Sequence, residues 1–233
     1  MGESGSWIDT ARRVLPEIVR LSGRIDPTYD LPGVSALDDA FLARHGVSAL
    51  IWDVDGTLTA HHASTVAPGA RARFEALRQR ADLRHAIVSN CPLPRFRELG
   101  ALFPDIPVIL GAVTPQGLAF RVLHEGRETR RGPGADRLGG PGVRPLRKPS
   151  AQLVEAVLRV IGMEAARDHV LMVGDQHFTD IASATLAGVR SARVPTIDRA
   201  GFPWPVRVSQ RLERGLYRVR RALGFGRPAA GEP

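Results

Sequence analysis

The stretch "VSALIWDVDGTL", residues 47–58, joins a short apolar run to two acids and a tight turn. Branched apolar residues in an unbroken run are typical of a strand that is buried on both faces of a sheet. Asp53 and Asp55 come where this run ends, and Gly56 directly after them favours a turn. We therefore expect a buried strand whose carboxyl end presents two carboxylates.

Similar apolar runs recur along the chain and alternate with helical patterns. This alternation indicates right-handed crossovers between parallel strands, with helices on both faces of the sheet. The predicted fold class is α/β, with a doubly wound, Rossmann-like parallel sheet. The expected strands are 47–54, 85–89, 108–110, 169–175 and 191–194, and the expected helices are 7–21, 68–81, 94–103, 151–162 and 179–188.

Composition divides the chain into three expected segments. These are an N-terminal helix and connector in 1–34, a catalytic body in 35–198 and a basic amphipathic tail in 199–233. The body contains a Gly-, Pro- and Arg-rich insertion at about 112–147, which is either a small lid over the site or a disordered loop. Within it, "HEGRE" (124–128) favours a small hairpin.

Charge and cysteine content limit the classes of protein to consider. The net charge is +8, and residues 199–233 contribute eight arginines against two glutamates. The single cysteine, Cys91, excludes an intramolecular disulfide and a multi-cysteine metal site, and it suits a reducing compartment. No apolar run reaches the roughly 18 residues of a membrane span, and we recognise no secretory leader. We expect a cytoplasmic protein, either free or peripheral at the inner membrane surface.

Polar residues follow the predicted strands at the edge where ligands bind in parallel sheets. Three acids converging there repel one another unless a cation sits among them, which favours a hard divalent ion. The chain's only lysine precedes the helix that leads into the fourth strand, and it can contact both a carboxylate and an anionic substrate; chance retention of one lysine among 31 arginines is the alternative. The residues are Asp53, Asp55, Ser89, Asn90, Lys148 and Asp175.

Four motifs carry a resemblance to a known family. "DVDGTL" (53–58), "IVSN" (87–90), "RKPS" (147–150) and "VGDQHFTD" (173–180) resemble, in order and in strand context, the signature motifs of the haloacid dehalogenase (HAD) superfamily. The resemblance runs from about 47 to 195. More narrowly, "KPS", "VGDQHFTDI" and the first segment resemble the YqeG group, which is related to phosphatidylglycerophosphate phosphatases.

The resemblance implies a phosphatase mechanism. Asp53 would be the nucleophile and form an aspartyl phosphate, and Asp55 would be the general acid and base. Mg²⁺ would be held by Asp53, the backbone carbonyl of Asp55 and Asp175, with Asp180 as a direct ligand or next to one.

The resemblance also assigns the phosphate-binding residues. Ser89, Asn90 and neighbouring backbone N–H groups would bind phosphate oxygens, while Lys148 neutralises the transferring group. Gly56 and Thr57 would belong to the tight loop after the nucleophile. The short interval between the first two motifs leaves no room for a cap domain there, so we expect little or no cap.

The tail predicts a basic amphipathic helix over about 205–224. Such a helix can lie on an anionic membrane, or its apolar stripe can pack on the catalytic body or on a second subunit. Nothing in it resembles a nucleic-acid recognition motif, so nucleic acid is not an expected partner. The stripe is Val208, Leu212, Leu216, Val219 and Leu223, and the arginines beside it are Arg207, Arg211, Arg214, Arg218 and Arg221.

Together these features predict a magnesium-dependent phosphomonoester hydrolase. The expected substrate is a phosphorylated small molecule or a lipid-linked phosphate such as phosphatidylglycerophosphate. The alternatives are a soluble metabolite phosphatase, a phosphotransferase that passes the phosphoryl group to another alcohol, and a non-catalytic scaffold that binds RNA or a partner through the basic tail.

Overall fold

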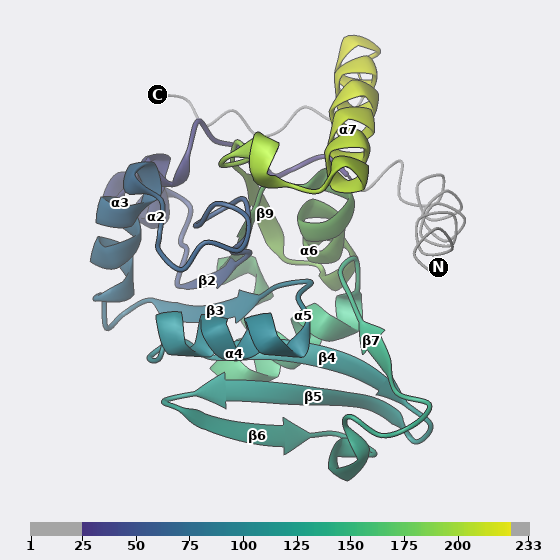
Figure 1. Ribbon diagram of the computed structural model, residues 1–233. Coiled ribbons are helices and arrows are strands. Elements are labelled where there is room, and N and C mark those ends of the chain that lie inside the picture. Colours follow the sequence, from purple (N-terminus) through teal and green to yellow (C-terminus); the bar gives the residue numbers. More distant parts are fainter. Residues whose placement is uncertain (1–24, 225–233) are drawn as a thin grey trace.

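The computed structural model describes residues 25–224, so the helix expected at 7–21 lies outside the described residues (Figure 1). Within them the chain forms one nine-stranded sheet, in the order β1-β9-β8-β2-β3-β4-β5-β6, with β7 also paired to β4. The strands are β1 (Tyr29–Asp30), β2 (Ala49–Trp52), β3 (Arg84–Val88), β4 (Val108–Thr114), β5 (Gly117–His124), β6 (Arg127–Arg131), β7 (Arg144–Leu146), β8 (Val170–Gly174) and β9 (Arg190–Arg193).

Across the sheet from β1 through β9, β8, β2 and β3 to β4, each pair of neighbouring strands is parallel. This arrangement confirms the predicted fold class. β2 lies between β8 and β3, with Ile51 opposite Met172 on one side and Ala86 on the other. Because β2 has a parallel neighbour on each side and helices above and below, all four of its residues are buried. The unbroken apolar run at 49–52 is the consequence of this position.

Helices cover both faces of the sheet, and Figure 1 shows α4 and α5 on opposite sides of it. Leu50 and Trp52 of β2 pack with α2, α3 and α4 on one face. Ala49 and Ile51, which point the other way, pack with α5 and α6. The helices are α2 (Asp39–Arg44), α3 (Pro68–Arg78), α4 (Leu93–Leu102), α5 (Ala151–Ile161), α6 (Ala182–Ala187) and α7 (Trp204–Ala222), and a π-helical turn (His177–Ile181) leads into α6.

The insertion at 112–147 is neither a lid nor a disordered loop, which corrects both sequence-based readings. It extends the sheet: β4 continues to Thr114, and β5, β6 and β7 add to it antiparallel. Antiparallel strands need only tight turns, and the turn at Glu125–Gly126 confirms the predicted hairpin. Phe120 and Val122 pack against the α5 side of the core, which explains why the extension is ordered despite its Gly and Arg content.

Helix α7 forms where the sequence predicts a basic amphipathic helix, but its orientation contradicts the alternative in which the apolar stripe packs on the body of the fold. Leu212 and Val219 are exposed, whereas Gln210, Glu213 and Tyr217 are buried against the body. Of the predicted stripe, only Leu216 packs on a core cluster. The reason is that the polar side chains find partners near the strand ends, as described below.

No helix within residues 25–224 combines the length and the apolar character that crossing a membrane requires.

The different burial of Phe74 and Leu212 predicts that their substitution by alanine changes the free energy of unfolding by very different amounts. Phe74 of α3 is fully buried, with ring centroids 5.4 Å from those of both Trp52 and Phe103. Phe74→Ala should lower the free energy of unfolding by about 3–5 kcal/mol because it leaves a cavity. Leu212→Ala, at a side chain 65% exposed, should change it by no more than about 0.5 kcal/mol. Urea denaturation measures both, and an equal cost would contradict the outward orientation of the α7 stripe.

Candidate active site

The carboxyl ends of β2, β3 and β8 bring the predicted acids to one edge of the sheet. Asp53 follows β2 and Asp175 follows β8, and these strands are neighbours: the Asp53 N–H donates to the carbonyl of Val173 at 2.9 Å. Asp53 and Asp175 are both buried, as is Ser89 at the end of β3. The convergence predicted from the alternating pattern is therefore present.

Lys148 joins two of the acids. Its Nζ donates to Asp53 Oδ1 and to Asp180 Oδ1, each at 2.6 Å, and to the carbonyl of Val88 at 3.0 Å. The side chain is 2% exposed, so these three acceptors account for all three of the ammonium protons. A compact ammonium can reach three convergent acceptors, whereas a planar guanidinium of larger size cannot occupy the same space.

The main chain of Lys148 is held by Asn90. The Lys148 N–H donates to Asn90 Oδ1 at 2.7 Å, and the Asn90 Nδ2 donates back to the Lys148 carbonyl at 3.0 Å. Both ends of the amide are thus used to fix the lysine, although the sequence assigned Asn90 to phosphate oxygens.

Asp180 lies on the π-helical turn directly after β8. Its Oδ2 accepts a hydrogen bond from the N–H of Gln176 at 3.1 Å, while Oδ1 accepts from Lys148. A Cβ at Gly174 would come within 2.4 Å of the Asp180 carboxylate, so only glycine permits this approach at the strand end. The glycine of the "VGD" motif therefore positions the acid five residues after Asp175.

Three carboxylates can hold a cation at this edge. Ligand oxygens of Asp53, Asp175 and Asp180 all lie within 4.8 Å of one another, and Lys148 supplies one positive charge against three negative ones. Oδ1 of Asp175 is buried and has no hydrogen-bond partner among the described residues. Buried polar atoms are normally paired, so this oxygen and the uncompensated charge fit a hard divalent ion.

The pKa values of the acids reflect the same crowding. Burial raises the pKa of Asp53 to about 7, with Lys148 opposing the rise and Asp180 adding to it. Burial also raises the pKa of Asp175 well above its usual range, and the charges of Asp180 and Asp53 raise it further. Burial alone would lower the pKa of Lys148, but the carboxylates of Asp180 and Asp53 outweigh it and raise the pKa. The lysine is therefore charged.

The loop after Asp53 is built for close approach. Gly56 has φ of 97°, which disfavours other residues, and a Cβ there would lie 2.9 Å from the Phe202 ring and 3.2 Å from the Asp175 carboxylate. Thr57 donates from Oγ1 to Asp53 Oδ2 at 3.3 Å. The Asp53 carboxylate is thus held on one oxygen by Lys148 and on the other by Thr57.

Arg95 of α4 is a site residue that the sequence reading missed. Its side chain is 2% exposed, and Nη2 donates to Asp55 Oδ1 at 2.7 Å and to the carbonyl of Ala63 at 2.9 Å. Asp55 Oδ1 also accepts from the N–H of His62 at 3.0 Å. The sequence did contain an indication of this role. Arg95 lies four residues before Leu99, which places both side chains on the same, inward face of the amphipathic helix.

The tail also contributes to the site. Gln210 of α7 donates from Nε2 to Asp175 Oδ2 at 3.5 Å, and Glu213 Oε2 accepts from the N–H of His177 at 3.1 Å. The ring of Phe202, just before α7, lies 4.4 Å from that of His61. Helix periodicity alone gave no indication of these contacts, because they depend on how α7 is rotated against the body.

A family comparison covers part of the candidate site. Residues 145–197, which carry Lys148, Asp175 and Asp180, match the HAD-hydrolase-like family. Among solved structures, the chain is similar to a Bacillus subtilis protein assigned as a p-nitrophenyl phosphatase, with 17% identity and a TM-score of 0.19; the match covers 70% of this chain and 65% of that one, which is less than two thirds of its length. No curated protein matches the chain significantly. The segment that carries Lys148, Asp175 and Asp180 is thus similar to HAD-hydrolase-like proteins.

Proposed function

We propose that the protein is a magnesium-dependent phosphomonoester hydrolase that works through an aspartyl phosphate on Asp53. The observation that carries the proposal is the setting of this carboxylate. Lys148 and Thr57 fix its two oxygens, and two further acids lie within reach of a shared cation. A fixed, buried carboxylate beside a site for a divalent ion is suited to attack an anionic phosphorus centre. The HAD-like match over residues 145–197 supports it.

The first half of the reaction forms a bond from an Asp53 oxygen to phosphorus and breaks the bond from phosphorus to the leaving oxygen. Asp55 gives its proton to that oxygen, and the alcohol leaves. In the second half, Asp55 takes a proton from water, the water oxygen attacks phosphorus, and the Asp53–phosphorus bond breaks to release inorganic phosphate. The sum is one ester and one water consumed, with one alcohol and one phosphate formed.

Mg²⁺ would be held by Asp53, Asp175 and the backbone carbonyl of Asp55, and when bound it neutralises negative charge on the phosphate oxygens and the nucleophile. Asp180, whose oxygens accept from Lys148 and from the Gln176 N–H, would be a further ligand of the ion or lie next to one. Ser89 would bind the phosphate oxygens, and Asn90 would act through the Lys148 main chain. The N–H groups of Gly56 and Thr57 donate to the carbonyls of Thr59 and Val54, so these two residues would shape the loop rather than bind phosphate through their N–H groups.

For the substrate we propose a lipid-linked phosphate such as phosphatidylglycerophosphate. The resemblance of the motifs to the YqeG group and the basic tail support this choice over a soluble phosphorylated metabolite. We further propose residues 35–198 as the catalytic body, with 199–233 as a tail that also lines the site through Phe202 and Gln210.

The nucleophile gives the most direct test. The wild-type chain should hydrolyse an aryl phosphate when Mg²⁺ is present and lose turnover when it is chelated. Asp53→Asn should reduce turnover on the order of 10³-fold or more, because no other group can replace the attacking oxygen. Asp136→Asn, at an exposed acid of the sheet extension, is the matched control. Turnover by Asp53→Asn close to the wild-type rate would refute the mechanism, and a wild type that hydrolyses no phosphate ester would favour the scaffold alternative.

Lys148 gives a second test. Lys148→Arg preserves the charge but cannot place one compact donor on Asp53, Asp180 and the Val88 carbonyl together. We expect turnover to fall by roughly 10²–10³-fold, as for removal of a preorganised donor in other enzymes. Arg147→Lys, the reverse change at the exposed neighbouring residue, should be neutral. Steady-state kinetics with an aryl phosphate measure both, and full activity of Lys148→Arg would show that the lone lysine has no special role.

Metal binding and pH should be coupled in the thermal stability of the protein. Because the folded-state pKa of Asp53 is raised to about 7, the metal-free folded protein binds protons that the unfolded chain releases at lower pH. Its stability should therefore fall as pH rises from about 4 to 7. Mg²⁺ at a hundred times its dissociation constant should add about 2.7 kcal/mol, or roughly 5–10 °C for a chain of this size, and add less at pH 5.

Thermal unfolding with Mg²⁺ or with chelator at pH 5 and pH 8 measures this coupling. Asp175→Asn is the companion variant, since removing one negative charge from the cluster should stabilise the metal-free protein and reduce the effect of Mg²⁺. An unfolding midpoint that does not respond to Mg²⁺ at pH 8 would argue against a cation site at these acids.

A further inference from the structure

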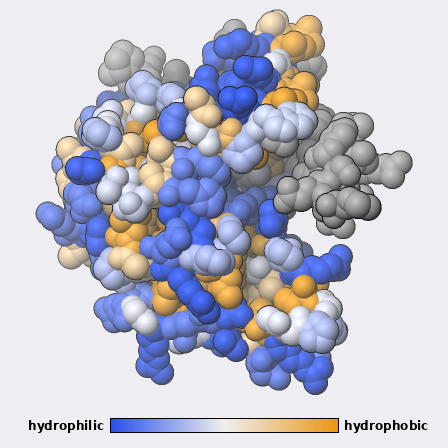
Figure 2. Space-filling view, viewed as in Figure 1, coloured by the Kyte–Doolittle hydropathy of each residue, from blue (hydrophilic) through white to orange (hydrophobic). Residues whose placement is uncertain are grey.

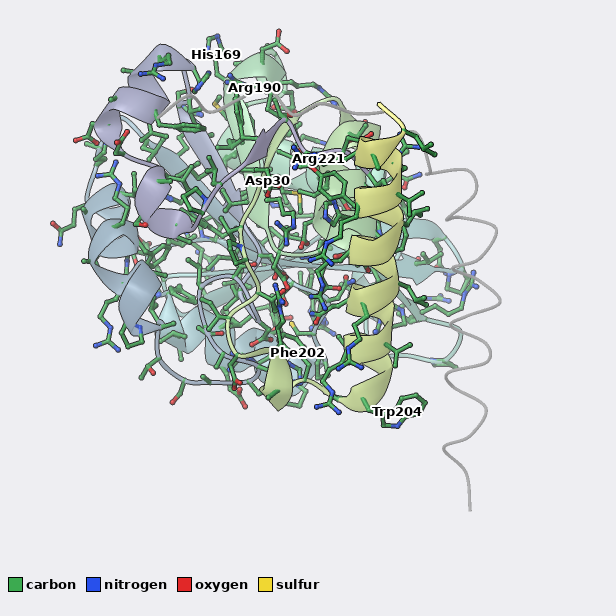
Figure 3. The ribbon with its side chains drawn as sticks, turned by 90° about the horizontal axis from the view of Figure 1, so that it is seen from above. Asp30, His169, Arg190, Phe202, Trp204 and Arg221 are labelled. Atoms are coloured by element: carbon green, nitrogen blue, oxygen red, sulfur yellow. The ribbon has the colours of Figure 1, made fainter. Side chains whose placement is uncertain are left out.

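Helix α7 has an exposed apolar face that points away from the protein. Among residues 25–224, the large hydrophobic side chains that are exposed all lie on this helix or directly after it. Figure 3 shows Trp204 at the start of α7, pointing away from the body. A contiguous apolar stripe of this kind is unusual on a protein surface and indicates a binding face. Its members are Trp204 (60% exposed), Val208 (42%), Leu212 (65%), Val219 (56%) and Leu223 (67%).

One flank of the stripe is a row of arginines. They follow one another at intervals of four, three, four and three residues, which keeps them on one side of a helix. Figure 2 shows this division, with orange along one side of α7 and blue along the other. The helix contains a single acid, Glu213, and it faces inward, where it is 2% exposed. The row is Arg207, Arg211, Arg214, Arg218 and Arg221.

We propose that this outer face of α7 binds the surface of an anionic lipid bilayer, with the helix lying in the plane of the interface. An interfacial helix needs an apolar face to enter the boundary of the acyl chains and basic side chains to contact anionic headgroups, and α7 presents both without an outward acid. Its 19 residues give a contact about 28 Å long. A nucleic acid would match the arginines but leave the apolar stripe exposed.

The opposite face of the same helix contacts one acid of the site, Asp175. Gln210 donates to Asp175, and Phe202, two residues before α7, lies against Gly56. A bilayer bound to the outer face would therefore lie one helix thickness from the metal-binding acids, which suits a lipid-linked phosphate. This consequence for the substrate rests on the proposed function, whereas lipid binding by α7 does not.

Vesicle flotation with the full-length chain tests the proposal. The protein should float with phosphatidylcholine vesicles that contain phosphatidylglycerol, much less with phosphatidylcholine alone, and less at high salt. Leu212→Glu with Val219→Glu should abolish binding, and Arg211→Gln with Arg218→Gln should weaken it by roughly 5-fold per arginine. Arg127→Gln with Arg144→Gln, exposed on the sheet extension, is the charge-matched control and should leave binding unchanged. Unchanged thermal midpoints show that all variants fold.

Three results would overturn it. These are no flotation with phosphatidylglycerol at low salt, flotation that survives Leu212→Glu with Val219→Glu, and a stable dimer in sedimentation that these two substitutions dissociate, which would assign the face to a second copy. Vesicle binding without phosphatase activity would refute the proposed function and leave this inference standing. Turnover of an aryl phosphate without vesicle binding would refute this inference and support the proposed function.

A separate observation concerns the contacts of Asp55. Its Oδ1 accepts hydrogen bonds from Arg95 Nη2, the His62 N–H and Thr59 Oγ1, whereas Oδ2 receives, from the residues that the structure describes, only a long one at 3.4 Å from Arg95 Nε. One oxygen is therefore held and the other is nearly free. Arg95 is itself fixed by the carbonyl of Ala63 and by Glu98.

We infer that Arg95 is a positioning residue that orients Asp55 so that Oδ2 faces the leaving oxygen. The inference rests on the proposed function, in which Asp55 is the general acid. Proton donation matters most for leaving groups that are strong bases, such as alkoxides, and little for nitrophenolates, so the effect of losing Arg95 should depend on the leaving group.

Turnover of an alkyl phosphate and of a nitrophenyl phosphate tests this positioning role. Arg95→Met should slow the alkyl ester by roughly 10²-fold more than the aryl ester, in line with the contribution of general acids, and Asp55→Asn should show the same selectivity. Arg95→Lys retains the positive charge, so its selectivity between the two esters should lie between those of the wild type and Arg95→Met. Arg97→Met, at an exposed arginine of the same helix, should change neither rate. Equal slowing of both esters would reduce Arg95 to a structural role, whereas a wild type that cleaves neither ester would instead refute the proposed function.

Discussion

The contact on which the site depends is the buried ammonium of Lys148 between Asp53 and Asp180. Without that charge, the ends of β2 and β8 would bring together acids that burial and mutual repulsion both disfavour. Much of the local structure serves this contact: Asn90 fixes the lysine's main chain, and Gly174 leaves room for the Asp180 carboxylate. The arrangement still leaves more negative than positive charge, which is why it suits a cation and an anionic substrate.

The sequence predicts the parallel sheet and the meeting of Asp53, Asp175 and Lys148 because these follow from rules that act along the chain. Buried strands read as apolar runs, and their carboxyl ends share one edge. Arg95 and Gln210 could not be predicted in this way. Their partners lie 40 and 35 residues away in the chain, and the contacts depend on how a helix is rotated against the sheet. The periodicity of apolar residues along a helix does not specify this rotation.

The insertion at 112–147 and the tail differ in what decides their structure. Both sequence-based alternatives for the insertion were wrong, because Phe120 and Val122 complete the core beside α5 and make the segment part of the sheet. For the tail, the sequence left open whether the apolar stripe lies on a membrane, on the body of the fold or on a second subunit, and the structure contradicts the body, since the partners of Gln210 and Glu213 turn that polar face inward. Burying satisfied polar groups can compete with burying apolar ones, so a helix can turn its apolar side outward.

Phe202 joins the tail to the loop that follows Asp53. Its ring occupies the space that a side chain at Gly56 would fill, and it contacts the ring of His61 near the same loop. The composition suggests that residues 199–233 are an appendage, but Phe202 lies against Gly56 and Gln210 donates to Asp175. The C-terminal helix therefore forms part of the wall around the acids, and a shortened chain without it would lack two of the side chains that surround them.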